Sequence, residues 1–592
     1  MTSMVGCVDP AMPVESSMAE VLRRRAADSG DRLAFSYLQA DGTEGPRLSY
    51  GELDSQASRI AAALLRQAEP GDRALLLYAP GLEFIAAFVG CLYAGLVAVP
   101  AYPPRLDRPW QGVEHLSRIA TDCQVRAVLT GGEYAADIRR LCRNISPLLD
   151  AVWFNTSDAL PAGRGWSTFA EDASAISHLQ YTSGSTGMPK GVVVTHANVM
   201  HNEYMIARAN GHFETGAAGI CGVSWLPFQH DLGLIAGMLQ AIYVGGPLVV
   251  LSPLTMLQRP FVWLDAISRY RAHTSAGPNF AYELCVRRLT ADERAALDLS
   301  CWCIAGLGAE PVRAVTIDAF SATFANSGFR REAFYPSYGL AEATLMVAGG
   351  ERLQGPRIGW VATTDLQQKR GLVNGSKPSY DSDARPLVGC GHAWLDQQIV
   401  IVDPVSRQPC PKAQVGEIWV AGPSVAQGYW QRPEESQQIF GAQLKGHEGR
   451  RFLRTGDLGF FAEGELYVTG RLKDMLIVRG QNHYPQDIEA TVQSCGEMFR
   501  ADSGAVFQSD RSGNDRLVVV QEIVRPAKDF SVVAATRKVR EEIAQRHGIE
   551  VDEVVWVRAA TLPKTTSGKI RRQACRAAYE AGELSLWQPG PS

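Results

Sequence analysis

The sequence predicts an α/β protein built around parallel β-sheets, and two observations support this prediction. An apolar run at residues 74–78, an apolar helical stretch at 81–95 and a second apolar run at 97–100 follow one another directly. A strand, a helix and a strand at this spacing form a βαβ unit, whose two strands lie parallel in one sheet. Strand-like runs at 127–130 and 151–154 continue the pattern. The 592 residues exceed one hydrophobic core, so about four domain-sized units are expected.

Composition and charge exclude several classes of protein. The formal net charge of −4 gives no reason to expect nucleic acid or an anionic membrane as a partner. The 12 cysteines show no CxxC or Cys/His ligand spacing, which fits reduced thiols in a cytoplasmic protein. Residues 1–17 lack the pattern of a signal peptide, and the longest apolar stretch, 232–251, is interrupted by polar residues, glycines and a proline. No transmembrane segment is expected.

A loop at residues 181–191 holds four Ser or Thr hydroxyls, three glycines and Lys190. Strands are expected on either side of it, at 175–179 and 192–195. Glycines let backbone N–H groups approach phosphate oxygens closely, hydroxyls add donors, and the lysine supplies a positive charge. This composition suits a polyphosphate, although a plain polar hairpin has similar residues.

Two further segments have residues suited to an acid or a nucleotide. His230 and Asp231 follow an expected strand end at 225–227. A lone histidine is more often a satisfied core or surface residue than a functional one. Residues 304–311 read as a strand ending in glycines, which would let a flat ring such as adenine lie against the backbone. A simple strand-to-helix turn, with Pro311 opening the helix, explains the same residues.

Two later segments combine aromatic, glycine and acidic residues. In residues 334–344, Tyr338 next to a glycine can stack on a base, and Glu342 can reach Mg²⁺. In residues 452–459, Asp457 can accept hydrogen bonds from both hydroxyls of a ribose, which neutral side chains do less well. Both segments are therefore candidates for nucleotide binding.

The second half of the chain changes character several times. Residues 351–388 are polar and rich in turns, as in a functional insertion or a linker. Residues 398–402 and 416–420 alternate like antiparallel strands of a small barrel. A strand at 517–524 and a helix at 534–547 indicate a small α+β domain at the end of the chain.

Two basic segments remain. Residues 464–474 place a glycine and a charged run between two strand pieces, which suits either a hinge or a surface turn. Residues 562–572 contain Lys569 in a basic tail, where a lysine is most often only a solvated charge.

These motifs, in this order, resemble those of the adenylate-forming superfamily, which includes acyl-CoA synthetases, luciferases, peptide-synthetase adenylation domains and fatty acyl-AMP ligases. The resemblance covers the chain from about residue 18 to 575. It implies a large N-terminal domain, residues 1–472, with two parallel-sheet α/β subdomains, a small β-barrel and a family-type insertion at about 351–388. It also implies a mobile α+β C-terminal domain, residues 473–592, joined to the large domain by a hinge.

The resemblance assigns a role to each motif. Binding of ATP and AMP is expected of Thr182, Ser183, Gly184, Ser185, Thr186, Gly187, Lys190, Gly308, Ala309, Glu310, Ser337, Tyr338, Gly339, Leu340, Ala341, Asp457, Arg471 and Lys569. Contact with an acyl substrate is expected of His230, Asp231, Leu234, Asn279, Phe280 and Gly339, and contact with Mg²⁺ of Thr186 and Glu342. The expected catalytic residues are Lys569, His230 and Lys190, and the expected hinge is Lys473 and Asp474.

Within the superfamily, the His-Asp pair, the insertion and residues 479–489 are most similar to fatty acyl-AMP ligases, although Gln481 stands where a basic residue is common. This implies ATP-dependent activation of a medium- or long-chain fatty acid to acyl-AMP, with release of pyrophosphate. Transfer to the phosphopantetheine thiol of an acyl carrier protein, or of a polyketide or peptide synthase carrier domain in trans, would follow. A fatty acyl-CoA synthetase is the alternative, and a non-catalytic acyl-nucleotide-binding protein is a second.

Overall fold

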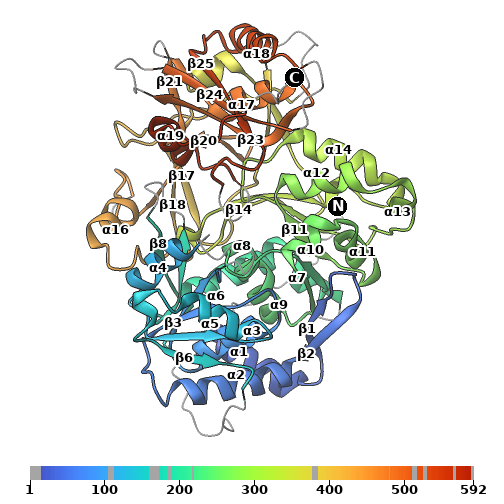
Figure 1. The fold of residues 1–592 in the computed structure, drawn as a ribbon, viewed down its shortest axis with the longest axis vertical. Helices are drawn as coiled ribbons and strands as arrows, with labels where there is room; N and C mark the ends of the chain where they lie inside the picture. The colour runs from blue at the N-terminus through green and yellow to red at the C-terminus, as the bar shows by residue number, and fades with distance from the viewer. Residues whose placement is uncertain are drawn as a thin grey trace, which may run out of the picture.

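The computed structural model describes residues 15–104, 112–158, 172–182, 188–216, 219–375, 384–447, 449–478, 481–509, 516–524, 530–564 and 569–587. Two large sheets and their helices occupy one end of the long axis, and the elements from β21 (Leu476–Val478) onward occupy the other end (Figure 1). None of the described helices is long and apolar enough to cross a membrane. Every cysteine in these ranges is free of a disulfide, as the sequence predicts.

The first sheet has six strands in the order β6-β5-β3-β4-β7-β8. Its strands are β3 (Arg73–Leu77), β4 (Val97–Ala101), β5 (Ala127–Thr130), β6 (Val152–Asn155), β7 (Ile176–Thr182) and β8 (Lys190–Thr195). All neighbours are parallel except β7 and β8, which pair antiparallel. The expected βαβ unit is confirmed as β3, α3 (Glu83–Tyr93) and β4. The helices α4 (Val113–Asp122) and α5 (Ala135–Cys142) connect further strands of this sheet.

The second sheet has eight strands in the order β14-β13-β12-β11-β9-β10-β1-β2. They are β1 (Leu33–Leu38), β2 (Glu44–Ser49), β9 (Gly222–Ser224), β10 (Leu248–Leu251), β11 (Thr274–Gly277), β12 (Ile304–Leu307), β13 (Phe334–Gly339) and β14 (Met346–Gly349). The interior pairs are parallel, and β2 and β14 pair antiparallel at the two edges. The carboxyl ends of the parallel strands therefore meet along one side of the sheet.

One hydrophobic core includes residues of both sheets and of the helices between them. Helix α6 (His196–Ala209) is buried along most of its length and begins at Thr195, which forms a capping box with Asn198. The neighbouring helices are α1 (Met18–Ser29), α2 (Tyr50–Leu64), α7 (His212–Thr215), α8 (Asp231–Gly233), the π-helix η4 (Leu234–Leu239) and α9 (Gln240–Val244). On the other face of the second sheet lie α10 (Pro253–Gln258), α11 (Phe261–Arg269), α12 (Asn279–Arg288), α13 (Ala291–Ala295) and α14 (Ala314–Phe324).

A four-stranded antiparallel sheet follows, in the order β17-β18-β19-β20. The strands are β17 (Gln398–Val402), β18 (Gly416–Ala421), β19 (Leu453–Ala462) and β20 (Glu465–Arg471), and α16 (Pro433–Phe440) lies between β18 and β19 in the chain. The antiparallel strands expected at 398–402 and 416–420 are confirmed as β17 and β18, and within the described residues they belong to this open sheet, so closure into a small barrel stays a prediction. The described part of the insertion folds as β15 (Ile358–Ala362), α15 (Thr363–Gln367) and β16 (Ala384–Val388). Val361 and Leu387 of the insertion share a core with Phe460 of β19, so this segment is packed rather than a loose linker.

The last elements form an α+β unit, as the sequence predicts. Its sheet has the order β23-β24-β25, with β23 (Phe499–Ser509), β24 (Arg516–Ile523) and β25 (Glu553–Arg558). The helices are α17 (Pro485–Ser494), α18 (Val532–His547) and α19 (Arg572–Ala581), and the short hairpin of β21 and β22 (Gln481–His483) precedes them. Two hydrophobic clusters contain only residues of this unit. The division of the chain between residues 472 and 473 stays a prediction.

Aromatic packing behind the second sheet generates a stability prediction. The Phe320 ring on α14 is fully buried and packs against Tyr282, Trp302 and Phe329. Replacing it by alanine, Phe320→Ala, should destabilise this part of the protein by about 3–5 kcal/mol, because transfer and cavity terms add. Val315 lies on the same helix at 66% exposure, so Val315→Ala should change stability by less than about 0.5 kcal/mol. Thermal unfolding measures both variants, and equal midpoints would contradict the prediction.

Candidate active site

A cleft of about 2710 Å³ lies where the carboxyl ends of strands from both large sheets meet the antiparallel sheet and the C-terminal unit. Ligands of open α/β sheets bind at this kind of strand end. Of the residues predicted from the sequence, those that line the cleft are Thr182, Lys190, His230, Asp231, Asn279, Gly308, Ala309, Glu310, Ser337, Tyr338, Gly339, Leu340, Ala341, Glu342, Asp457, Arg471, Lys473, Asp474 and Lys569.

The remaining predicted residues do not line the described cleft. Leu234 opens the π-helix η4 and is fully buried in the core between the two large sheets. Phe280 packs edge-to-face against Trp225 at 5.9 Å on the other face of the second sheet. Ser183, Gly184, Ser185, Thr186 and Gly187 lie outside the described residues. Contact of any of these with a ligand stays a prediction.

Asp457 is held at the centre of the cleft wall by two neighbours. Strand pairing sets Asp457 of β19 opposite Arg471 of β20, and Arg471 Nε lies 2.9 Å from Asp457 Oδ1. Tyr338 Oη donates to Asp457 Oδ2 at 2.8 Å. The charge of Asp457 raises the pKa of Arg471, so this guanidinium remains charged. The carboxylate and guanidinium form a fixed pair of opposite charges next to an aromatic ring, which suits the sugar and base of a nucleotide.

A second charged group surrounds Lys569. His230 Nδ1 lies 2.6 Å from Asp231 Oδ1, and the backbone N–H of Leu232 donates to the same oxygen at 2.7 Å. Burial alone would raise the pKa of Asp231, but His230, the backbone hydrogen bond and the charge of Lys569 together lower it. Asp231 is therefore an anion that faces a lysine brought in from the end of the chain.

Glu310 also lines the cleft and lies in the turn that follows β12. Its carboxylate accepts hydrogen bonds from the backbone N–H of Asn279 at 2.7 Å and from Asn279 Nδ2 at 2.9 Å. Asn279 also accepts from the backbone N–H of Arg313 at 3.0 Å, so one buried amide holds the whole turn. Ala309 adopts a left-handed backbone with φ of 66°, which is strained for a residue with a side chain. The turn is thus fixed before any ligand arrives.

Lys190 lies at the end of the hydroxyl-rich loop and has protein partners of its own. Its ammonium pairs with Glu435 of α16 and lies 5.2 Å from the centre of the Tyr429 ring. Tyr429 Oη in turn donates to Glu342 Oε1 at 2.9 Å, and burial raises the pKa of Glu342. No local pattern in the sequence indicates a role for Glu435 or Tyr429, because both lie more than two hundred residues after the loop.

No group of three or more His, Cys, Asp or Glu side chains within the described ranges could hold a metal ion by protein ligands alone. Mg²⁺ is commonly bound through one or two carboxylates together with substrate phosphates and water. The buried Glu342 carboxylate fits that role in part, since it lines the cleft and accepts a hydrogen bond from Tyr429.

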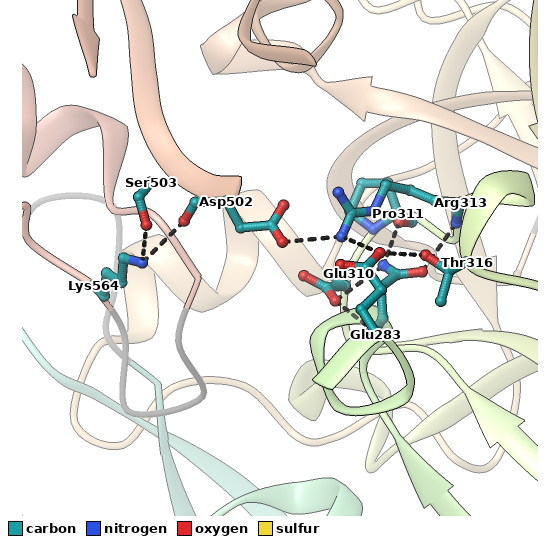
Figure 2. Close-up of polar contacts among 9 residues, drawn as sticks. Glu283, Glu310, Pro311, Arg313, Thr316, Asp502, Ser503 and Lys564 are labelled. Atoms are coloured by element: carbon teal, nitrogen blue, oxygen red, sulfur yellow. Dashed lines mark hydrogen bonds and ion pairs between the residues drawn. The ribbon is translucent and has the colours of Figure 1, made fainter. Parts of the chain in front are cut away.

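Two ion pairs fasten the C-terminal unit over the cleft. Arg313 Nη2 lies 2.9 Å from Asp502 Oδ2 of β23, and the same guanidinium nitrogen lies 2.8 Å from Glu283 of α12 (Figure 2). Lys564 supports this strand from behind, because its ammonium donates to the carbonyl of Asp502 and to Ser503 Oγ. The second pair joins Arg385 of β16 to Asp487 of α17 at 2.7 Å.

Between these pairs, the chain passes from β20 into the C-terminal unit through the 3-10 turn η8 (Leu472–Asp474). Arg572 of α19 pairs with Asp474 at 3.3 Å and, through two hydrogen bonds of 2.7 Å, with Glu489 of α17. Burial and the nearby Arg471 lower the pKa of Lys473. Rotation about this turn, which the resemblance implies, stays a prediction.

Tyr338 lies beside the Asp457–Arg471 pair, and Lys569 enters the same cleft from the C-terminal unit, an arrangement suited to a nucleotide. Comparison with known protein families also indicates a nucleotide-binding enzyme. Residues 22–430 match the family described as AMP-binding enzyme, and residues 473–588 match the family described as Disco-interacting protein 2-like, AMP domain. The chain belongs to the AMP-binding enzymes, which use ATP.

Individual relatives within this family are similar to the chain over nearly its whole length. The chain is 42% identical to the medium-chain-fatty-acid–[acyl-carrier-protein] ligase JamA of Moorena producens (strain JHB), over 97% of each chain. It is 35% identical to the long-chain-fatty-acid–AMP ligase FadD32 of Mycolicibacterium smegmatis, over 97% of this chain and 95% of the relative. The crystal structure of fatty acid AMP ligase from Legionella pneumophila matches with a TM-score of 0.73 at 37% identity, covering 98% of this chain and 99% of that one. The resemblance to the adenylate-forming superfamily and the predicted fold class are confirmed.

The environment of Lys569 predicts a pH dependence of nucleotide binding. Burial and the positive charge of Arg471 lower the pKa of Lys569 from 10.5, against the opposing charges of Glu310, Asp231 and Asp457. The protonated ammonium is the form that attracts phosphate, so affinity for ATP should fall as the pH rises through a value below 10.5.

The variant Lys569→Arg keeps its charge across this range and should bind ATP with less dependence on pH. Calorimetric titration with ATP between neutral pH and pH 10.5 measures both proteins. An identical decline in the two would assign the titration to another group.

Proposed function

We propose that this enzyme activates a medium-chain fatty acid with ATP and passes the acyl group to the phosphopantetheine thiol of an acyl carrier protein in trans. The observation that most supports the proposal is the position of Lys569, which reaches from the C-terminal unit to Asp231, Glu310 and Asp457 in one cleft. The names of full-length relatives, a fatty acid–carrier protein ligase and a fatty acid–AMP ligase, support the substrate and the acceptor.

In the first step, an oxygen of the fatty acid carboxylate bonds to the α-phosphorus of ATP, and the bond from that phosphorus to the bridging oxygen breaks. Pyrophosphate leaves with the electron pair. The carboxylate is already ionised, so no protein nucleophile or base is needed. Two anions must be held together, and negative charge grows on the phosphate oxygens. Alignment and positive charge are therefore the main demands on the protein.

Lys569 and Lys190 supply that charge in our proposal. Lys190 is neutralised by Glu435 in the structure, so a phosphate group would have to replace this carboxylate as its partner. The exchange is possible because Lys190 and Glu435 remain accessible from the cleft. Tyr338, Asp457 and Arg471 would hold the base and ribose, and Glu342 would hold a Mg²⁺ ion, which would supply positive charge against the phosphates.

We further propose that the large domain ends at residue 472 and that the C-terminal domain, from 473, rotates about Lys473 and Asp474 between the two steps. The start of the second family match at residue 473 supports this division. Rotation would withdraw Lys569 and open the cleft to the carrier thiol. A cytoplasmic location is part of the proposal, in keeping with the free cysteines.

Exchange of labelled pyrophosphate into ATP, dependent on decanoic acid, tests the first step. The variant Lys569→Ala should lower the exchange rate by about 10²–10³-fold, because one preorganised charge is lost. Lys412→Ala is the matched control, since Lys412 is exposed and away from the cleft. Exchange within a few-fold of the parent in Lys569→Ala would remove Lys569 from the proposal. A parent protein with no exchange for any acid would instead favour a non-catalytic acyl-nucleotide-binding role.

The acceptor is tested separately from the first step. The purified enzyme, ATP and fatty acid are mixed with either CoA or a holo acyl carrier protein, and thioester formation is followed by mass spectrometry. We expect the acyl carrier protein to be loaded and CoA to react at least tenfold more slowly. The reason for this expectation is that the packed insertion adjoins the hairpin that follows the proposed hinge, where Asn482 Nδ2 donates to the carbonyl of Gln367. Faster formation of acyl-CoA would establish the fatty acyl-CoA synthetase instead.

A further inference from the structure

The cleft extends from the charged site into the interior, between the second sheet and α6. One wall is lined by Ile304 and Gly306 of β12 and by Gly308, just past the end of this strand. These three residues occupy alternate positions, which lie on the same face of the sheet. Residues Ile206 and Asn210, one helical turn apart at the end of α6, line the facing wall. This arm of the cleft therefore runs from the carboxyl ends of the strands toward their amino ends.

The arm has a definite depth. From Gly308 to Ile304 the backbone rises by about 13 Å, at ~3.3 Å per residue. Strand pairing places Thr274 of β11 opposite Ile304, so these two residues mark its inner end. An extended acyl chain advances by ~1.25 Å per carbon, given tetrahedral bonds of about 1.5 Å. The arm therefore has room for about ten carbons.

The inner end is polar, which an alkyl chain does not require. Asn210 is 7% exposed, and its Oδ1 is buried with no hydrogen-bond partner among the residues that the structure describes. The Thr274 hydroxyl lies between two histidines, 2.9 Å from His273 Nδ1 and 3.4 Å from His212 Nε2. A buried carboxamide oxygen without a partner is unfavourable, since it has lost its hydrogen bonds to water.

The groups behind this end are polar but carry no available charge. Burial lowers the pKa of His212 to about 3 and that of His273 to about 4, so both rings are neutral at physiological pH. His212 Nδ1 lies 3.2 Å from the Gln240 amide, which contacts Glu203. Burial raises the pKa of Glu203 far above its ordinary value, so it is protonated. Arg352, a cation close to this end, is engaged by other groups: it donates to Thr215 Oγ1 at 2.8 Å and to the carbonyl of Gly211.

We propose that the enzyme selects medium-chain acids that carry a neutral hydroxyl group at the far end, with Asn210 and Thr274 as the residues that recognise it. This inference rests on the proposed function and names its substrate class. A hydroxyl both donates and accepts, so it satisfies the free carboxamide and the threonine together. A methyl end leaves Asn210 unpaired, and a second carboxylate would enter without a counter-charge.

Pyrophosphate exchange with three acids of one length tests the proposal in the parent enzyme: 10-hydroxydecanoic, decanoic and decanedioic acid. We expect kcat/KM for the hydroxy acid to exceed that for decanoic acid about tenfold, the effect of one additional buried hydrogen bond. Decanedioic acid should be the poorest of the three. Moving the hydroxyl inward, as in 6-hydroxydecanoic acid, should remove the advantage.

Variants locate the effect. Asn210→Leu has a similar volume and should reverse the preference in favour of decanoic acid, and Thr274→Val should reduce it. Lys412→Ala, at an exposed residue that does not line the cleft, is the control and should leave the ratio unchanged. The ratio is insensitive to the amount of folded enzyme, and the parent measurements decide the matter if a variant does not fold.

The outcomes separate this inference from the proposed function. If decanoic acid equals or exceeds the hydroxy acid in the parent, terminal recognition is wrong while fatty acid activation stands. The same holds if Asn210→Leu keeps the parent's ratio. If no acid of any length supports exchange, the proposed function itself fails.

Discussion

The structure depends on opposite charges that are gathered in the cleft where the C-terminal unit meets the two large sheets. Lys569 and Arg471 lie among Asp231, Glu310 and Asp457, and Arg471 pairs directly with Asp457. Removing such charges from water is unfavourable unless each one is paired, and replacing them by apolar residues would often give a more stable protein. Their arrangement is therefore better explained by ligand binding than by folding. An anionic ligand can replace a carboxylate as the partner of a cation. The positive charges of the site are therefore balanced both with and without the ligand.

Ion pairs also attach the C-terminal unit to the rest of the protein. Arg313 and Asp502 are about one-third exposed, and an ion pair of this kind contributes roughly 0–1 kcal/mol. Such a contact orients the unit without locking it. The pair of Arg385 with Asp487 is more buried, and burial raises the pKa of Asp487 to about 6 despite the neighbouring guanidinium. The insertion thus provides the more buried of the two contacts.

Short-range patterns in the sequence predicted much of this architecture. The βαβ unit, the strands at 398–402 and 416–420, and the α+β end of the chain follow from hydrophobic periodicity, which is a local property. Nearly all of the site residues that the motifs predicted, where the structure describes them, line the cleft. The resemblance predicts that Leu234 contacts the acyl chain. Its side chain is buried in the core at the start of the π-helix and does not line the described cleft, so this contact stays a prediction. Periodicity alone does not reveal the change of helical phase that a π-helix introduces.

Residues that act through tertiary contacts could not be predicted in this way. Glu435 meets Lys190 across 245 positions of sequence, and Asp502 meets Arg313 across 189. Asn210 is the clearest case, because a polar residue at the end of a helix is ordinary in sequence and is usually solvated. Only the fold shows that this helix end is enclosed between two sheets, beside Thr274 and two neutral histidines. The polarity of that enclosure, rather than its size alone, distinguishes it from a site that merely accommodates an alkyl chain.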